Sequence, residues 1–285
     1  MKRLIATYGG IPIYSGESYV KAPPLVDVDV SGGDITYDGD YAIITFTEDG
    51  SISFMEDYYT GNIPDVSILL VGGGGAGAGF DAQNYKSGSG GGGGEVVETS
   101  ISPLAGDYSI IVGAGGDGDT TQPGPGIQNY AEWGYKSELA GPVSIDASGG
   151  QGALWPTSNP VIDPGKSGDS GSGFTGLEYT GEFEAPGGAG DSQNGQSGTS
   201  GGGINTGGDG GNGSLSSLSG TEIGYGGGGS GSGLNAYGDA SYGARSEGSG
   251  IANRGGGGSG RGENTGSGNG YSGGSGIVII RYKYK

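Results

Sequence analysis

The sequence predicts an all-β fold, in which β-sandwich-like strands anchor long glycine-rich loops or short polyglycine-type segments. Short apolar runs such as Val66–Val71 are typical of buried strands, and several other runs alternate apolar with polar residues. Glycine supplies 75 of the 285 residues, and glycine interrupts helices. The stretch Asn129–Ala140 contains some helix-forming residues, but Gly134 interrupts it and no helical period is sustained, so no helix is expected.

Each expected strand is bounded by turn residues. Val26–Asp34 and Glu95–Ile101 alternate, Tyr41–Phe54 is two β-rich runs around Glu-Asp-Gly, and Val66–Val71 is continuously apolar. The remaining expected strands lie within Pro103–Gly116, Gly141–Gly150 and Ser275–Tyr284. Most of these strands meet a glycine run at one end, which suggests that the strands anchor the glycine.

Residues 149–276 are mostly Gly, Ser, Asn and Asp with isolated aromatic residues. By composition this stretch is either a flexible linker or an ordered assembly. Glycine can form an extended left-handed helix of three residues per turn, and such helices can pack side by side. Gly207–Gly213 holds a three-residue period only briefly, which excludes a collagen triple helix. Because Ser275–Tyr284 is a strand, the chain must return to the sheet.

The composition excludes several kinds of chemistry. The chain has no cysteine and no histidine, so it lacks thiolate metal ligands and the usual general base. Its net charge of −19 opposes binding to nucleic acid or to an anionic membrane. No apolar run is long enough for a membrane helix, so no membrane insertion is expected, and no secretory leader is recognised. We therefore expect no enzyme, no cofactor and no metal.

Three local motifs are weak. Gly-Lys-Ser at 165–167 lacks the first glycine of a P-loop, because that position is Pro160. Ser272 lies in a Gly-x-Ser-x-Gly pattern without a histidine partner. Gly115–Thr120 and Gly207–Leu215 partly match a calcium-binding nonapeptide but are not repeated in tandem, so their aspartates are better explained as turn residues.

The expected organisation is an N-terminal attachment segment, 1–30, followed by a glycine-rich β domain, 31–285. That domain is strand-rich over 31–148, glycine-rich over 149–275, and closed by a strand over 276–284. The residues expected to dock the N-terminal segment are Tyr8, Ile11, Ile13, Tyr14 and Tyr19.

Isolated aromatic residues in the glycine-rich part have two interpretations. They fill gaps beneath the glycine segments, or some of them contact a ligand, since Tyr with Ser, Gly and Asn is the mixture used by antibody paratopes. The candidate receptor contacts are Trp155, Tyr225, Tyr237 and Tyr242.

The order of these motifs resembles the glycine-rich domain of bacteriophage virion proteins, which occurs in tail-fibre and receptor-binding components. The resemblance covers Ile35–Tyr284. It is carried by LLVGGGGAG at 69–77, YSIIVGAGG at 108–116 and GGSGIVIIRY at 273–282, taken together. It implies a β-rich virion component without catalysis, often trimeric.

The expected function is a fibre or tail-tip protein that contributes to host-surface attachment through a glycan or an outer-membrane protein. Its expected partners are other phage virion proteins and further copies of itself, with a trimer favoured. It would be assembled in the host cytoplasm and released by lysis. The alternative is a head or tail decoration or fibre protein that binds only other virion proteins. A cellular Gly/Tyr-rich matrix protein is a more distant third option.

Overall fold

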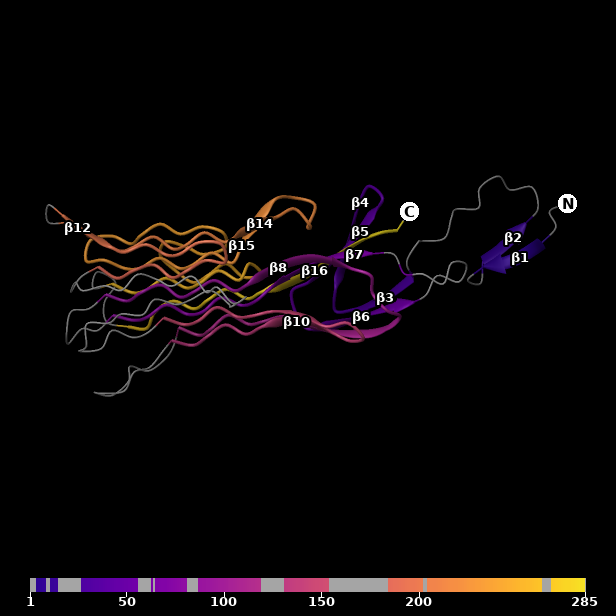
Figure 1. Ribbon diagram of the computed structural model, residues 1–285, viewed down its shortest axis with the longest axis horizontal. Helices are drawn as coiled ribbons and strands as arrows, with labels where there is room; N and C mark the ends of the chain where they lie inside the picture. The colour runs from indigo at the N-terminus through magenta and orange to yellow at the C-terminus, as the bar shows by residue number, and fades with distance from the viewer. Residues whose placement is uncertain are drawn as a thin grey trace.

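The computed structural model describes residues 4–8, 11–14, 27–55, 63, 65–80, 87–118, 131–153, 184–201, 204–262 and 268–284 (Figure 1). All the regular elements among these residues are β-strands, so the all-β prediction is confirmed. Among them there is no helix long and apolar enough to cross a membrane.

Two antiparallel five-stranded sheets form the centre of the molecule. The first has the order β11-β10-β9-β6-β3 and the second β4-β5-β16-β7-β8. The strands of the first sheet are β3 (Asp27–Ser31), β6 (Gly50–Met55), β9 (Gly106–Ile111), β10 (Ser137–Ala140) and β11 (Ile145–Ala147). Those of the second are β4 (Asp34–Asp38), β5 (Tyr41–Phe46), β7 (Val66–Val71), β8 (Val96–Ile101) and β16 (Ile277–Lys283).

The facing sides of the two sheets form one hydrophobic core, so the arrangement is a sandwich. Phe46, Ile68 and Ile280 from the second sheet pack with Phe54 and Tyr108 from the first. The rings of Phe54 and Tyr108 meet edge to face with centroids 5.4 Å apart. Strictly alternating strands such as β6 place one side in this core and the other toward solvent, as their sequences predict.

The outer side of the second sheet carries a smaller apolar layer. There Ile43, Leu69 and Ile279 are covered by the hairpin of β14 (Ser214–Ser216) and β15 (Ile223–Tyr225), mainly through Tyr225. The second sheet is therefore buried on both sides near its middle. This double burial explains why β7 and β16 are continuously apolar instead of alternating.

The glycine runs form a bundle of extended segments that leaves one end of the sandwich (Figure 1). We call this the glycine bundle. Its described segments are 72–80, 87–95, 113–118, 131–136, 148–153, 184–198, 206–213, 226–262 and 268–276. They are joined laterally by backbone hydrogen bonds between segments that are far apart in the chain.

The segment 72–78 shows the geometry of the bundle most clearly, because its N–H groups donate to three different neighbours in turn. All seven donor–acceptor distances are 2.8–3.0 Å. The N–H groups of Gly72, Gly75 and Ala78 donate to the carbonyls of Glu95, Gly92 and Ser89 in the segment 87–95. Those of Gly73 and Ala76 donate to Tyr135 and Glu132 in 131–136, and those of Gly74 and Gly77 donate to Gly274 and Tyr271 in 268–276. Its carbonyls accept from three more segments, 113–118, 148–153 and 255–262. This period of three is that of a polyproline-II-like helix, here surrounded by six others.

Close packing of these helices requires glycine at their contact points. A Cβ added to Gly74, Gly75 or Gly77 would lie closer than 3.0 Å to a carbonyl oxygen of a neighbouring segment. Side chains are therefore accommodated only where a segment faces the outside or a gap. The two alternatives left open by the sequence are thus decided for polyglycine-type segments; glycine-rich loops are not confirmed.

The bundle begins earlier in the chain than the glycine-rich region proposed from composition. Segments 72–80, 87–95, 113–118 and 131–136 all precede residue 149. Two further hairpins complete the described structure. β12 (Thr199–Gly201) and β13 (Ile204–Thr206) lie at the far end of the bundle, whereas β1 (Leu4–Tyr8) and β2 (Ile11–Tyr14) lie beyond the opposite end of the sandwich (Figure 1).

Candidate functional site

The outer surface of the glycine bundle is the candidate functional site, because the bundle fixes the backbone from which side chains project. In the segment 131–136, Gly134 points toward its neighbour, and a Cβ there would meet the carbonyl of Gly73. The residues on either side, Trp133 and Tyr135, point away and are 53% and 58% exposed. Two large aromatic side chains are therefore held in solvent by a rigid backbone.

The backbone of this segment is fixed on three sides. The carbonyls of Tyr135 and Glu132 accept from Gly73 and Ala76 at 2.9 Å, and Tyr135 N–H donates to the carbonyl of Ala114 at 2.9 Å. On the third side Gly134 N–H donates to the carbonyl of Gly150 at 2.8 Å. Trp133 and Tyr135 remain exposed on the side of the segment that faces away from these three described neighbours.

Glu132 joins Tyr135 to the neighbouring segment 113–118. The Tyr135 hydroxyl donates to Glu132 Oε1 at 2.8 Å, and the backbone N–H of Asp117 donates to Glu132 Oε2 at 3.1 Å. The hydrogen bond to this carboxylate, with its negative charge, raises the pKa of Tyr135. We call Glu132, Trp133 and Tyr135 the flank patch.

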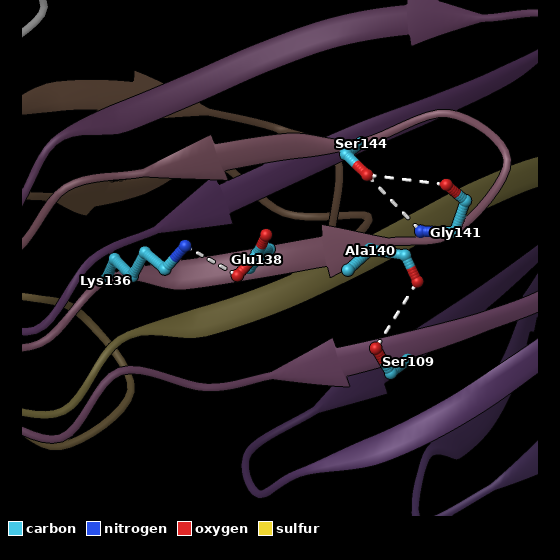
Figure 2. A network of polar contacts seen from close by, with 6 residues as sticks. All are labelled: Ser109, Lys136, Glu138, Ala140, Gly141 and Ser144. Carbon is cyan, nitrogen blue, oxygen red and sulfur yellow. Dashed lines mark hydrogen bonds and ion pairs between the residues drawn. The ribbon is translucent and has the colours of Figure 1, made fainter.

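Directly after the flank patch the chain enters β10 of the first sheet, and Figure 2 shows the residues that follow, from Lys136 to Ser144. Lys136 Nζ lies 2.7 Å from Glu138 Oε2, and this contact raises the pKa of Lys136. Farther along, Ser109 Oγ donates to the carbonyl of Ala140 at 3.3 Å, which ties β9 to β10 on the outer side of the sheet. Gly141 and Ser144 then close the turn into β11 through two 3.4 Å contacts. The patch is thus continuous with the sandwich.

Tyr237 lies in a second aromatic group, with Tyr271 and Arg261. The guanidinium carbon of Arg261 is 6.0 Å from the centre of the Tyr271 ring. Partial burial, followed by the neighbouring Tyr237, raises the pKa of Tyr271. Tyr237 is only half-buried, so one of the predicted receptor contacts remains partly accessible next to Tyr271.

Tyr242 is also half-buried, and its backbone has a φ of 53°. Its ring lies against Gly224 of β15, where a Cβ would overlap it. A positive φ is unusual for a bulky residue, so the surrounding contacts must hold this conformation. Tyr242 therefore covers the backbone of the β14–β15 hairpin and presents only part of its ring.

Tyr225 is corrected from a receptor contact to a core residue. Its side chain is 2% exposed and packs against the outer side of the second sheet. Burial raises its pKa. The prediction failed because glycine surrounds Tyr225 in the sequence, whereas in the fold β15 places it over Leu69 and Ile279. The fourth candidate, Trp155, lies outside the described residues.

The N-terminal docking candidates lie in β1 and β2, with one exception. Tyr8 ends β1, and Ile11, Ile13 and Tyr14 belong to β2, which pairs antiparallel with β1. Tyr19 lies outside the described residues. Neither strand pairs with any other described strand.

The polar motifs have structural partners. Asp209 Oδ1 accepts from the backbone N–H of Asp239 at 2.7 Å, and Ser272 Oγ accepts from the backbone N–H of Gly118 at 3.0 Å. No cluster of three metal-ligating side chains occurs within the described parts of the chain. The Gly-Lys-Ser motif at 165–167 lies outside them.

Trp133 and Tyr135 were missed as candidates, although the sequence contained a signal. They flank a single glycine, Gly134, in a stretch otherwise free of glycine. In a helix of three residues per turn, one glycine between two large side chains marks one inward and two outward positions. That signal can be recognised only once the lateral packing of the bundle is known.

Comparison with known proteins gives one family match. The sequence pattern of a glycine-rich domain family matches residues 57–283, which include the whole glycine bundle and most of the second sheet. No curated protein matches the chain. The chain therefore belongs to the glycine-rich domain family.

Proposed function

We propose that this protein is a non-enzymatic bacteriophage virion component, a fibre or tail-tip protein that contributes to attachment to the host surface. The phage assignment is supported by the resemblance of the glycine and strand motifs given above. The attachment role is supported by the exposed aromatic side chains on the glycine bundle, and chiefly by Trp133 and Tyr135.

The single observation that carries the proposal is the rigid display of these side chains. Aromatic residues give a large contact area at a low entropic cost, and rigid placement lowers that cost further. Each flank patch is small, so one copy would bind weakly. Several copies on one particle would raise the avidity without any tight single site. Tyr237 and Tyr242 add partly accessible rings.

A second function is favoured by one observation, the isolated β1–β2 hairpin. If the protein only decorates the virion, this hairpin attaches it to a neighbouring virion protein and the bundle serves as a spacer. The two proposals share the hairpin and differ in whether the bundle binds cells.

The test is saturable binding of the purified full-length protein to a panel of candidate host strains. We expect binding to a subset of strains. The double substitution Trp133→Ala/Tyr135→Ala should lower the apparent affinity about tenfold or more, as for aromatic hot spots. The matched control is Leu104→Ala, which removes a 58% exposed side chain on the sandwich and should leave binding unchanged.

The outcomes separate the two functions. A folded wild-type protein that binds no strain contradicts the attachment role and favours decoration. Strain-specific binding that the double substitution does not change contradicts the assignment of the flank patch, and the Tyr237 group would be examined next.

A further inference from the structure

Strand β4 is a fully exposed sheet edge. All five of its residues, Asp34–Asp38, are exposed, and among the described strands it pairs only with β5. An exposed edge offers a row of backbone hydrogen-bonding groups to any strand of suitable sequence. Ile35 and Tyr37 on this edge are 43% and 65% exposed, so the edge also presents apolar surface.

The two sides of β4 differ in chemistry. Ile35 is opposite Ile44 and Tyr37 is opposite Ala42, so both lie on the side of the sandwich core but beyond its cover. The Tyr37 ring is 4.9 Å from that of Tyr284. Asp34 and Asp38 lie on the other side of β4, where Asp38 forms a 2.9 Å ion pair with Arg281. A complementary strand therefore needs apolar residues on one side and positive charge near Asp34 on the other, because Asp38 already has Arg281 as its partner.

The β1–β2 hairpin is complementary to the β4 edge in its strand pairing and in its charge. It pairs with no other described strand, and an isolated two-stranded hairpin is marginally stable in water. The sequence of β1 is Leu-Ile-Ala-Thr-Tyr, and the two preceding residues are Lys2 and Arg3. These are two of only 12 basic residues in the chain. A third strand with exposed apolar residues and carboxylates would complete this hairpin.

Pairing of β4 with β4 of another copy is disfavoured. In a symmetric antiparallel pair centred on Thr36, Asp34 of each copy would lie opposite Asp38 of the other. Like charges in directly opposed positions destabilise a sheet. The acidic β4 edge therefore disfavours pairing with β4 of another copy and favours pairing with a strand that carries basic residues.

We propose that the β1–β2 hairpin of one copy adds to the β4 edge of a second copy, through β1. The contact joins two different surfaces, so it is heterologous and closes into a ring when the rotation between copies allows it. This inference rests on the proposed function in one respect, namely that the N-terminal segment docks to a neighbouring protein. It identifies that neighbour as another copy of this chain.

The contact can be tested by cross-linking, because the natural chain has no cysteine. Full-length chains carrying Thr7→Cys in β1 and Thr36→Cys in β4 are mixed and treated with a short bismaleimide. A product of twice the chain mass is expected from the mixture and not from either variant alone. Ser144→Cys, in the exposed β10–β11 turn, replaces Thr36→Cys in the control mixture and should give none.

A second, independent test reverses the charges on the two surfaces and does not use cross-linking. Asp34→Lys should weaken self-association by about tenfold, within the range seen for interfacial charge pairs. Adding Lys2→Glu and Arg3→Glu to the same chain should restore it. Light scattering over a range of concentrations gives the association, and thermal melting establishes that each variant is folded.

Several results would overturn the proposal. They are a wild-type chain that stays monomeric at every concentration, a cross-link formed by Thr36→Cys alone, and a Thr7→Cys/Thr36→Cys double variant that is linked only within one chain. None of these measurements uses cells. An oligomer that binds no host therefore contradicts the proposed function alone, and a monomer that binds host cells contradicts this inference alone.

Discussion

At the scale of single residues, the glycines of the bundle allow close packing because they have no Cβ atom. Gly75 donates to the carbonyl of Gly92 at 2.8 Å, and the space for a Cβ is occupied by the carbonyl of Gln151. Ordering glycine costs more backbone entropy than ordering any other residue. That cost is offset by lateral backbone hydrogen bonds, which form only when helices approach this closely.

Gly75→Ala is therefore expected to destabilise the protein, although alanine at an unconstrained site would restrict the unfolded chain and stabilise it. The new methyl group must push two segments apart, and overpacking of this kind costs about 1–3 kcal/mol. Chemical denaturation measures the change. The control is Gln196→Ala at an exposed side chain of the bundle, which should alter stability by less than about 0.5 kcal/mol. Equal effects at the two sites would contradict the packing argument.

At the scale of elements, the β14–β15 hairpin shows how a three-residue strand is stabilised by what it covers. Tyr225 is the fully buried residue of this hairpin on the outer side of the second sheet, and Ile223 packs beside it partly buried. Its hydroxyl lies where ionisation is disfavoured, since burial raises the pKa.

We expect a loss of stability in alkaline solution that depends on Tyr225. Because its pKa is raised in the folded state, the neutral phenol contributes stability that is fully present below the ordinary tyrosine pKa of about 10. That contribution is lost as the pH rises through the higher folded value. Comparing urea unfolding of the wild type and Tyr225→Phe at neutral and alkaline pH measures this. If Tyr225→Phe loses as much stability between neutral and alkaline pH as the wild type does, groups other than Tyr225 cause the loss.

At the scale of the whole molecule, the connections between the sandwich and the glycine bundle lead us to expect that the two unfold as one cooperative unit. Strand β16 lies in the middle of the second sheet, between β5 and β7, although it is the last strand in the chain. The chain leaves β7 directly into the segment 72–78 and enters β16 directly from 268–276. These two segments are hydrogen-bonded to each other through Gly74 and Gly274. The sandwich thus fixes the register of the bundle.

Amide hydrogen exchange should reveal this cooperativity. The amides of Gly74 and Ala76, inside the bundle, are expected to exchange as slowly as those of β16, since both open only in global unfolding. The amide of Gln196 donates to the carbonyl of Asp209 at 2.8 Å, but its segment leads into β12 and not into either five-stranded sheet, so it should exchange faster. Rapid exchange throughout the bundle beside a protected β16 would mean that the bundle opens independently of the sandwich.

The sequence by itself determined the all-β class, because periodicity and the scarcity of helix formers are local properties. It located β7 as a buried strand and β16 as a strand, and it proposed ordered polyglycine as one of two alternatives. Only the tertiary structure decided between those alternatives, since lateral hydrogen bonds join residues as distant as Gly74 and Gly274. For the same reason, only the tertiary structure showed that Tyr225 is buried in the core and that Trp133 and Tyr135 are exposed. A residue's exposure in a bundle depends on which neighbour each position faces, and that is set by lateral register that no local pattern encodes.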